Sequence, residues 1–109
     1  MTEQDFDTIL NERIESIKSV LKRKASEYAM SSDRLHNFKV AALIKDETPE
    51  LALWGMAIKH LVSVIDLIDS VECHRTACYS AERVNEKIGD LINYLILLEA
   101  LLKERLADI

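Results

Sequence analysis

Apolar residues recur every three or four positions along most of the chain, with charged residues between them. This spacing places the apolar side chains on one face of a helix and predicts helices over 3–29, 33–45, 49–69 and 81–106. The chain has only two glycines and one proline, so few positions are expected to break a helix. The pattern predicts an all-α, four-helix, bundle-like fold, and the length predicts a single domain over 1–109.

Local signals mark where three of these helices begin. Thr48 offers a capping hydroxyl and is followed by a proline and an acid, which suit the first helical turn. Thr2 is followed three residues later by Asp5, a spacing compatible with a helix cap. Ser80 is expected to cap the last helix, because the preceding segment 73–79 has no regular period and reads as a loop.

The predicted helix over 49–69 is apolar on nearly every side, which is more surface than three other helices cover. Part of it is therefore expected to face another subunit, so the fold is expected to be oligomeric through apolar helix faces, as a dimer or tetramer. Polar residues such as Lys59, Ser63 and Asp66 interrupt the apolar run. The run is shorter than the roughly 20 clean residues of a membrane span, and no membrane association is expected.

Charge and cysteine content narrow the function classes. A formal net charge of −5, with Lys22, Arg23 and Lys24 as the only basic run, argues against a nucleic-acid partner. Residues 1–10 carry acids and lack the basic start of a signal peptide. Two cysteines without secretion signals favour a reducing compartment, so a cytoplasmic protein is expected.

Two polar stripes stand out on the two long C-terminal helices. Each stripe has the spacing i, i+4 and i+7, which places its members on one helix face. The first stripe consists of Lys59, Ser63 and Asp66, with His60 beside it. The second stripe consists of Glu86, Asp90 and Asn93. If the stripes face each other they form a polar slot, in which carboxylates one turn apart are able to share a divalent cation. The alternative is that both stripes lie on ordinary solvated helix faces.

A third set of residues lies on the predicted second helix. Asp33 and Asn37 are expected to share one helix face, next to the aromatic ring of Phe38. An amide and a ring suit contact with a base or sugar. The alternative is that Asp33 starts the helix and Phe38 belongs to the core.

Cys73, His74 and Cys78 place three soft metal ligands within six residues. Structural zinc sites normally need four ligands, and the chain has no second cluster to complete the set. A metal site here would therefore require ligands from another subunit.

The order of several short motifs resembles the small MazG-like proteins of phages and prophages, relatives of the all-α nucleoside triphosphate pyrophosphohydrolases. The resemblance covers about residues 24–102. It implies an oligomeric helical fold and magnesium-dependent cleavage of a (d)NTP to the monophosphate and pyrophosphate. The motifs, in chain order, are Glu27-Tyr28, Asp33-Arg34-Leu35-His36-Asn37-Phe38, Thr48-Pro49-Glu50, Ile58-Lys59-His60-Leu61 and Glu86-Lys87-Ile88-Gly89-Asp90-Leu91-Ile92-Asn93-Tyr94.

The resemblance also assigns roles to residues. Glu86 and Asp90 match the acidic pair that holds metal on the last core helix of that family, and with Asp66 they are expected to bind magnesium. The family's preceding helix carries a cluster of glutamates, where this chain has Lys59 and His60, which are expected to steady phosphates. Glu86, Asp90, Lys59 and His60 are thus the expected catalytic residues. The residues expected to contact the nucleoside are Asp33, Asn37, Phe38 and Asn93.

Two functions follow as hypotheses. The first is a nucleotide pyrophosphohydrolase, or a degenerate relative that binds the nucleotide without cleaving it. The second is a non-catalytic phage or prophage helical protein whose apolar surface serves interaction or assembly. Pyrophosphate release and nucleotide-induced stabilisation distinguish the two.

Overall fold

The computed structural model describes residues 1–27 and 33–108, and in this part of the chain all regular structure is helical. The all-α prediction with four helices is therefore confirmed. The chain divides into two compact units, Met1–Arg34 and Leu35–Ile109, and each is described by itself. The helices are α1 (Glu3–Glu27), α2 (His36–Lys45), α3 (Pro49–Glu72) and α4 (Ala81–Ala107), with a short 3₁₀ turn, η1 (Thr76–Cys78), before α4.

The first unit consists mainly of α1. Its start is capped reciprocally, because the Asp5 amide donates to Thr2 Oγ1 and the Thr2 amide donates to Asp5 Oδ2, both at 3.0 Å. These hydrogen bonds hold the pKa of Asp5 below its usual value. The helix was expected to reach residue 29, but positions 28 and 29 lie outside the described residues.

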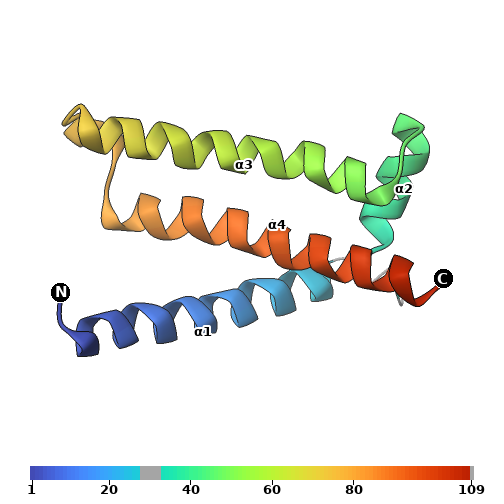
Figure 1. Cartoon of the computed structure of the whole chain (residues 1–109), viewed down its shortest axis with the longest axis horizontal. Helices are drawn as coiled ribbons and strands as arrows, with labels where there is room; N and C mark the ends of the chain where they lie inside the picture. The colour runs from blue at the N-terminus through green and yellow to red at the C-terminus, as the bar shows by residue number, and fades with distance from the viewer. Residues whose placement is uncertain (28–32, 109) are drawn as a thin grey trace. The chain divides into compact units, whose positions relative to one another are not determined.

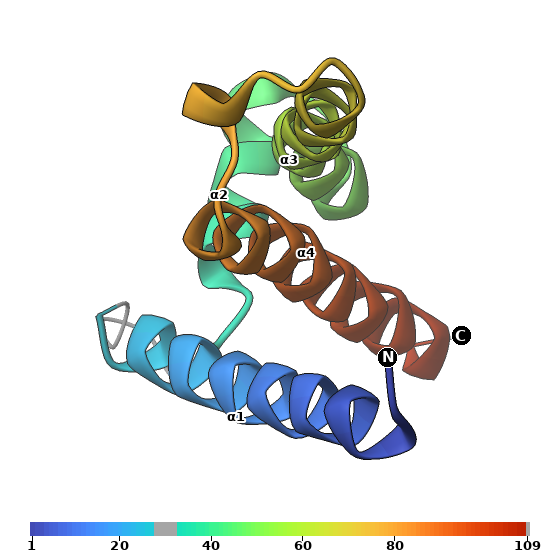
Figure 2. The same cartoon turned by 90° about the vertical axis from the view of Figure 1, so that its left-hand side faces the viewer.

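The second unit is an antiparallel pair, α3 and α4, with α2 packed against α3 at the end where α3 begins (Figures 1 and 2). The start of α3 meets the end of α4, because Glu50 contacts Arg105. All three helices supply the core. Its buried members are Leu35, Phe38, Leu53, Ala57 and Leu101, with Met56, Tyr94, Leu97 and Leu98 partly buried around them.

The predicted caps of α3 and α4 are confirmed. Thr48 Oγ1 accepts a hydrogen bond from the Leu51 amide at 3.3 Å, and Ser80 Oγ accepts one from the Arg83 amide at 3.1 Å. Both hydroxyls satisfy backbone N–H groups that have no partner inside their own helix. The sequence therefore located these two helix starts correctly.

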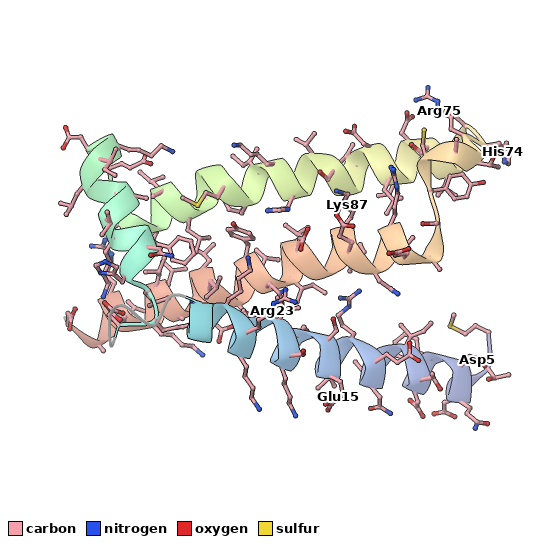
Figure 3. All side chains as sticks on the ribbon, turned by 180° about the vertical axis from the view of Figure 1, so that it is seen from behind. Asp5, Glu15, Arg23, His74, Arg75 and Lys87 are labelled. Carbon is pink, nitrogen blue, oxygen red and sulfur yellow. The ribbon has the colours of Figure 1, made fainter. Side chains whose placement is uncertain are left out.

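Two helix limits differ from prediction. The second helix was expected to begin at residue 33 but begins at His36, after a turn at residues 34–35. The third helix runs on to Glu72, three residues past its expected end, and the segment after it turns through His74, whose φ is 54°. Figure 3 labels His74 and Arg75 in this turn, where Arg75 Nη1 lies 3.5 Å from Asp69 Oδ2.

α3 is long and apolar enough, by length and composition, to cross a membrane, and it is the one such helix in the described part of the chain. Only 22% of its most apolar window is buried. Much of its apolar surface therefore faces outward from the second unit.

A bidentate ion pair joins the start of α3 to the end of α4. Arg105 Nε and Nη2 each donate to a Glu50 carboxylate oxygen at 2.7 Å. Two parallel charge-assisted bonds fix geometry more strongly than a single contact does. Hydrogen bonding from Arg105 also holds the pKa of Glu50 below its ordinary value of 4.5.

Replacing Glu50 with glutamine is expected to lower the thermal midpoint by a few degrees at neutral pH. Because the pKa of Glu50 is lower in the folded state, its contribution is present above its unfolded pKa and is lost as the pH falls through the folded value. Glu99→Gln is the matched control, since Glu99 pairs with Lys103 only within α4. Thermal unfolding followed by circular dichroism from neutral to acid pH measures both variants. Equal losses for the two, or a Glu50 effect that persists in acid, contradict this account.

Candidate functional site

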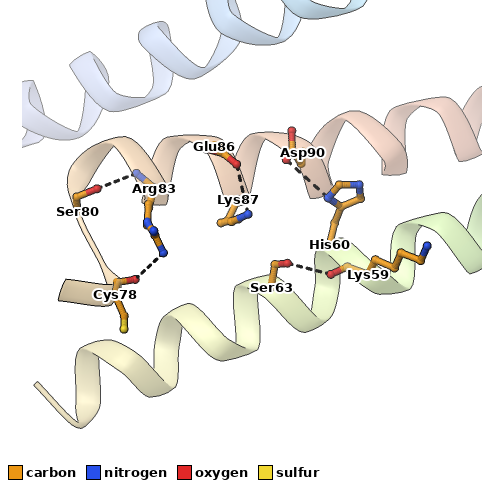
Figure 4. A network of polar contacts seen from close by, with 9 residues as sticks. All are labelled: Lys59, His60, Ser63, Cys78, Ser80, Arg83, Glu86, Lys87 and Asp90. Atoms are coloured by element: carbon orange, nitrogen blue, oxygen red, sulfur yellow. Dashed lines mark hydrogen bonds and ion pairs between the residues drawn. The ribbon is translucent and has the colours of Figure 1, made fainter. Parts of the chain in front are cut away.

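A chain of side-chain contacts runs across the interface of α3 and α4. His60 Nδ1 lies 3.6 Å from Asp90 Oδ2, and the His60 ring stacks on Tyr94 with centroids 4.7 Å apart and planes at 29°. The Tyr94 ring in turn meets Phe38 edge-on, at 6.5 Å and 72°. Figure 4 shows His60 pointing from α3 toward Asp90 on α4. Residues from α2, α3 and α4 thus meet in one place.

His60, Asp90, Tyr94 and the neighbouring Asn93 form what we name the His60 cluster. The side chains of His60 and Asp90 are 29% and 40% exposed, so a ligand in solvent is able to reach them. Asp90 faces Nδ1 of the imidazole, which leaves Nε2 to meet a ligand oxygen. Stacking on Tyr94 holds the plane of the imidazole ring.

Asn93 adds a side-chain amide oxygen to which no described residue donates a hydrogen bond. Its side chain is buried, and its Oδ1 atom has no hydrogen-bond partner among the described residues. Asn93 follows Asp90 by three positions on α4, so the two share a helix face. A buried amide oxygen without a donor costs about 1–3 kcal/mol, and ligand or water N–H and O–H groups would remove that cost.

The remaining members of the two stripes do not converge. Lys59 is exposed and extends along α3 away from Asp90, while the Ser63 hydroxyl donates to the Lys59 carbonyl oxygen at 3.1 Å (Figure 4). Asp66 is also exposed. Glu86 Oε1 lies 3.3 Å from Lys87 Nζ, and its side chain is 57% exposed. Of the two predicted stripes, therefore, His60 and Asp90 are the pair that meets.

The predicted metal ligands do not fit a magnesium site within one chain. Across residues 1–27 and 33–108, no three His, Cys, Asp or Glu side chains gather closely enough to hold a metal ion. Neither Asp66, Glu86 and Asp90 nor Cys73, His74 and Cys78 form such a group. Magnesium needs several oxygen ligands in near-octahedral geometry, and its binding is not built from separated surface acids.

The predicted nucleoside contacts on the second helix are also separated. Asp33 and Asn37 were expected to share a helix face, which is wrong, because Asp33 precedes the turn that leads into α2. Asn37 is exposed on α2, whereas Phe38 is 8% exposed and packs in the core. The structural alternative for Phe38, a core residue, is therefore the one observed.

Sequence reasoning overlooked Tyr94 as a member of the site. The signal was present, because Tyr94 lies four positions after Asp90 and so on the same face of the helix. It also passed over Lys87 as the partner of Glu86, since adjacent helix positions do not normally face each other.

Comparison of the chain with protein-family models, with curated proteins and with solved structures found no match.

Proposed function

We propose that this chain is a cytoplasmic, MazG-like nucleotide-binding protein whose nucleotide contacts the His60 cluster. The observation that carries the proposal is the meeting of His60, Asp90 and Tyr94, with Asn93 one helical turn after Asp90 on α4 and its buried amide oxygen unsatisfied among the described residues. Polar side-chain atoms that are buried in a folded domain normally have a hydrogen-bond partner. A nucleotide supplies both complements, because its phosphates accept hydrogen bonds and its sugar and base donate them.

Each residue has a definite part in the proposed binding. His60 donates to a phosphate oxygen, and Asp90 orients the imidazole. Lys59, one residue before His60, extends away from Asp90 in this structure, and a change of its side-chain rotamer brings its point charge toward the phosphates. Asn93 Oδ1 is buried, so it accepts from a sugar hydroxyl or a base N–H after the side chains that cover it move aside. Phe38 supports the Tyr94 ring from the core side.

The activity that the MazG resemblance implies is cleavage of a nucleoside triphosphate to the monophosphate and pyrophosphate. Asp66, Glu86 and Asp90 of one chain do not gather as a metal site among the described residues, so they offer magnesium no shared set of ligands. We therefore propose nucleotide binding first. Pyrophosphate release is the assay for cleavage of the bound nucleoside triphosphate.

The test is a panel of common NTPs and dNTPs, each with and without magnesium, read by thermal midpoint and by pyrophosphate release. At least one nucleotide is expected to raise the midpoint of the wild-type chain, because a ligand that binds only the folded state stabilises it. His60→Gln is expected to weaken that nucleotide at least tenfold, a loss of about 1.4 kcal/mol of binding free energy.

His36→Gln is the matched control, because His36 is an exposed histidine on α2 outside the cluster. Its affinity for the same nucleotide is expected to equal that of the wild type. If no nucleotide shifts the midpoint and none releases pyrophosphate, or if both histidine variants weaken binding equally, the nucleotide proposal fails.

A second candidate is a non-catalytic interaction protein. It is favoured by the apolar side chains that α3 presents to solvent, among them Ile65 and Ile68 at 55% and 56% exposure. Contiguous apolar patches of this kind mark interaction sites on soluble proteins. If no nucleotide of the panel shifts the thermal midpoint or releases pyrophosphate, the result favours this second candidate.

A further inference from the structure

α3 carries two apolar faces, and its own unit covers one of them. Ala52, Leu53, Ala57 and Leu67 are buried toward α2 and α4. The other face is a row of large side chains between 37% and 56% exposed, spaced alternately by three and four positions. This row, which we name the α3 seam, consists of Leu51, Trp54, Ile58, Leu61, Ile65 and Ile68.

The spacing of the α3 seam is that of a coiled-coil contact. Apolar residues that alternate by three and four positions form the a and d sites of a heptad repeat and stay aligned along a partner helix. A helix that only completes its own domain has no need of a second such row on its outer side. The pattern therefore indicates that another helix covers the seam.

The exposed area is large enough for a stable pair. With Val62 and Val71 at its edges, the seam leaves on the order of 700 Å² of side-chain surface uncovered, near the ~800 Å² per partner of a standard interface. The largest apolar patch on a typical monomer is about 300–600 Å². A partner of about the same length as α3 would cover the whole row.

We propose that the α3 seam binds the α3 seam of a second copy of this chain, with the two helices antiparallel. In one register every seam residue has a counterpart: Leu51 faces Ile68 of the other copy, Trp54 faces Ile65, and Ile58 faces Leu61. Side chains at the a positions of one helix then face side chains at the d positions of the other along the full row. Sliding one helix by a heptad in one direction places Trp54 against Glu72, and sliding it in the other direction leaves Ile65 and Ile68 beyond the start of the partner helix.

The antiparallel direction follows from side-chain volume and helix dipoles. A parallel pair in register would place two Trp54 rings in one layer, between a layer of two Leu51 side chains and a layer of two Ile58 side chains, so the layers would differ greatly in size. The antiparallel pair matches each Trp54 with the smaller Ile65. It also sets the positive start of one helix beside the negative end of the other. Both copies use the same surface, as a closed twofold dimer requires.

The charges around the seam favour a second copy over a lipid surface. α3 carries Glu50, Asp66, Asp69 and Glu72 but only one lysine, Lys59. An acidic margin is repelled by the anionic lipids of a cytoplasmic leaflet. A second copy carries the same acids, but Glu50 and Asp69, which face each other in this register, each lie beside an arginine of their own chain, Arg105 and Arg75.

The first experiment is the molar mass of the full chain in solution, by size-exclusion chromatography with light scattering over a range of concentrations. The wild type is expected at twice 12.4 kDa. Ile65→Glu is expected at 12.4 kDa with unchanged helicity, because it places a charge in the seam but not in the folded core. Ile44→Glu, at an 80% exposed site on α2, is the matched control and is expected to remain a dimer.

A second experiment tests the direction. In a background with Cys73→Ser and Cys78→Ser, single variants Leu51→Cys and Ile68→Cys are oxidised alone and as a mixture. In the antiparallel dimer two copies of position 51 lie about 25 Å apart, too far for a disulfide. Crosslinks are therefore expected only in the mixture, between position 51 of one copy and position 68 of the other.

Several results would overturn the proposal. If the wild-type chain stays monomeric at every concentration, a second copy does not cover the α3 seam. Flotation of that monomer with neutral phosphatidylcholine vesicles assigns the seam to a lipid surface instead. A dimer that survives Ile65→Glu shows that another face holds the copies together. Crosslinking of each cysteine variant by itself shows a parallel pair.

Discussion

Replacing Leu53 with alanine is expected to lower the free energy of unfolding by about 3 kcal/mol, the largest stability loss of any single substitution proposed for this chain. Leu53 is 0% exposed and belongs to the core that α2, α3 and α4 share. The shorter side chain loses hydrophobic burial and leaves a cavity that close-packed neighbours fill only in part. The expected fall in the thermal midpoint is roughly 10–20 °C.

Leu43→Ala is the control for that result. The same atoms are removed at a site on α2 that is 82% exposed, where the change is expected to stay within about 0.5 kcal/mol. Urea unfolding of both variants, followed by circular dichroism, compares the midpoints directly. Similar midpoints for the two would mean that Leu53 does not lie at the centre of the core.

Replacing Asn93 with leucine is expected to raise the free energy of unfolding by about 1 kcal/mol and to abolish nucleotide binding. The first effect follows because Asn93 Oδ1 is buried with no hydrogen-bond partner among the described residues, and leucine of similar size removes that desolvated acceptor. The second effect follows because leucine has no acceptor to offer the nucleoside. A residue that costs stability and supplies function is the usual form of this trade-off.

The two readouts of Asn93→Leu are separable. Urea unfolding without nucleotide measures the stability gain, and the nucleotide-induced midpoint shift measures binding. Asn11→Leu, on the exposed surface of α1, is expected to change neither by a measurable amount. A variant that is less stable than the wild type would show that Asn93 is satisfied in the folded protein. A more stable variant that still binds nucleotide would remove Asn93 from the site.

The nucleotide proposal and the self-association proposal use different sides of α3. His60 points across to Asp90 on α4 (Figure 4). Ile58 and Leu61 belong to the exposed α3 seam. Substitutions at His60 and Ile65 are thus expected to have independent effects, because the His60 side chain contacts α4 whereas the Ile65 side chain is exposed on α3. Each proposal is able to fail without the other.

The position of each helix was readable from the sequence wherever a local interaction sets it. Thr2 with Asp5, Thr48 and Ser80 each bond to a backbone amide within three residues, so their effect needs no distant partner. Phe38 and Ala42 lie four positions apart on one face of α2, and both are buried, as helical periodicity requires. The start of α2 was misplaced, because Asp33 resembles a helix-start residue but the turn at residues 34–35 follows it.

Only the tertiary structure decided which polar residues meet. Spacing places Lys59, Ser63 and Asp66 on one face of α3, and Glu86, Asp90 and Asn93 on one face of α4, but it does not set how far each helix is rotated about its axis. That rotation comes from packing of the buried faces, and it brings His60 to Asp90 while leaving Lys59, Asp66 and Glu86 exposed. The pairing of Glu50 with Arg105 has the same origin, since 55 residues of chain separate partners that only the antiparallel packing of α3 and α4 brings together.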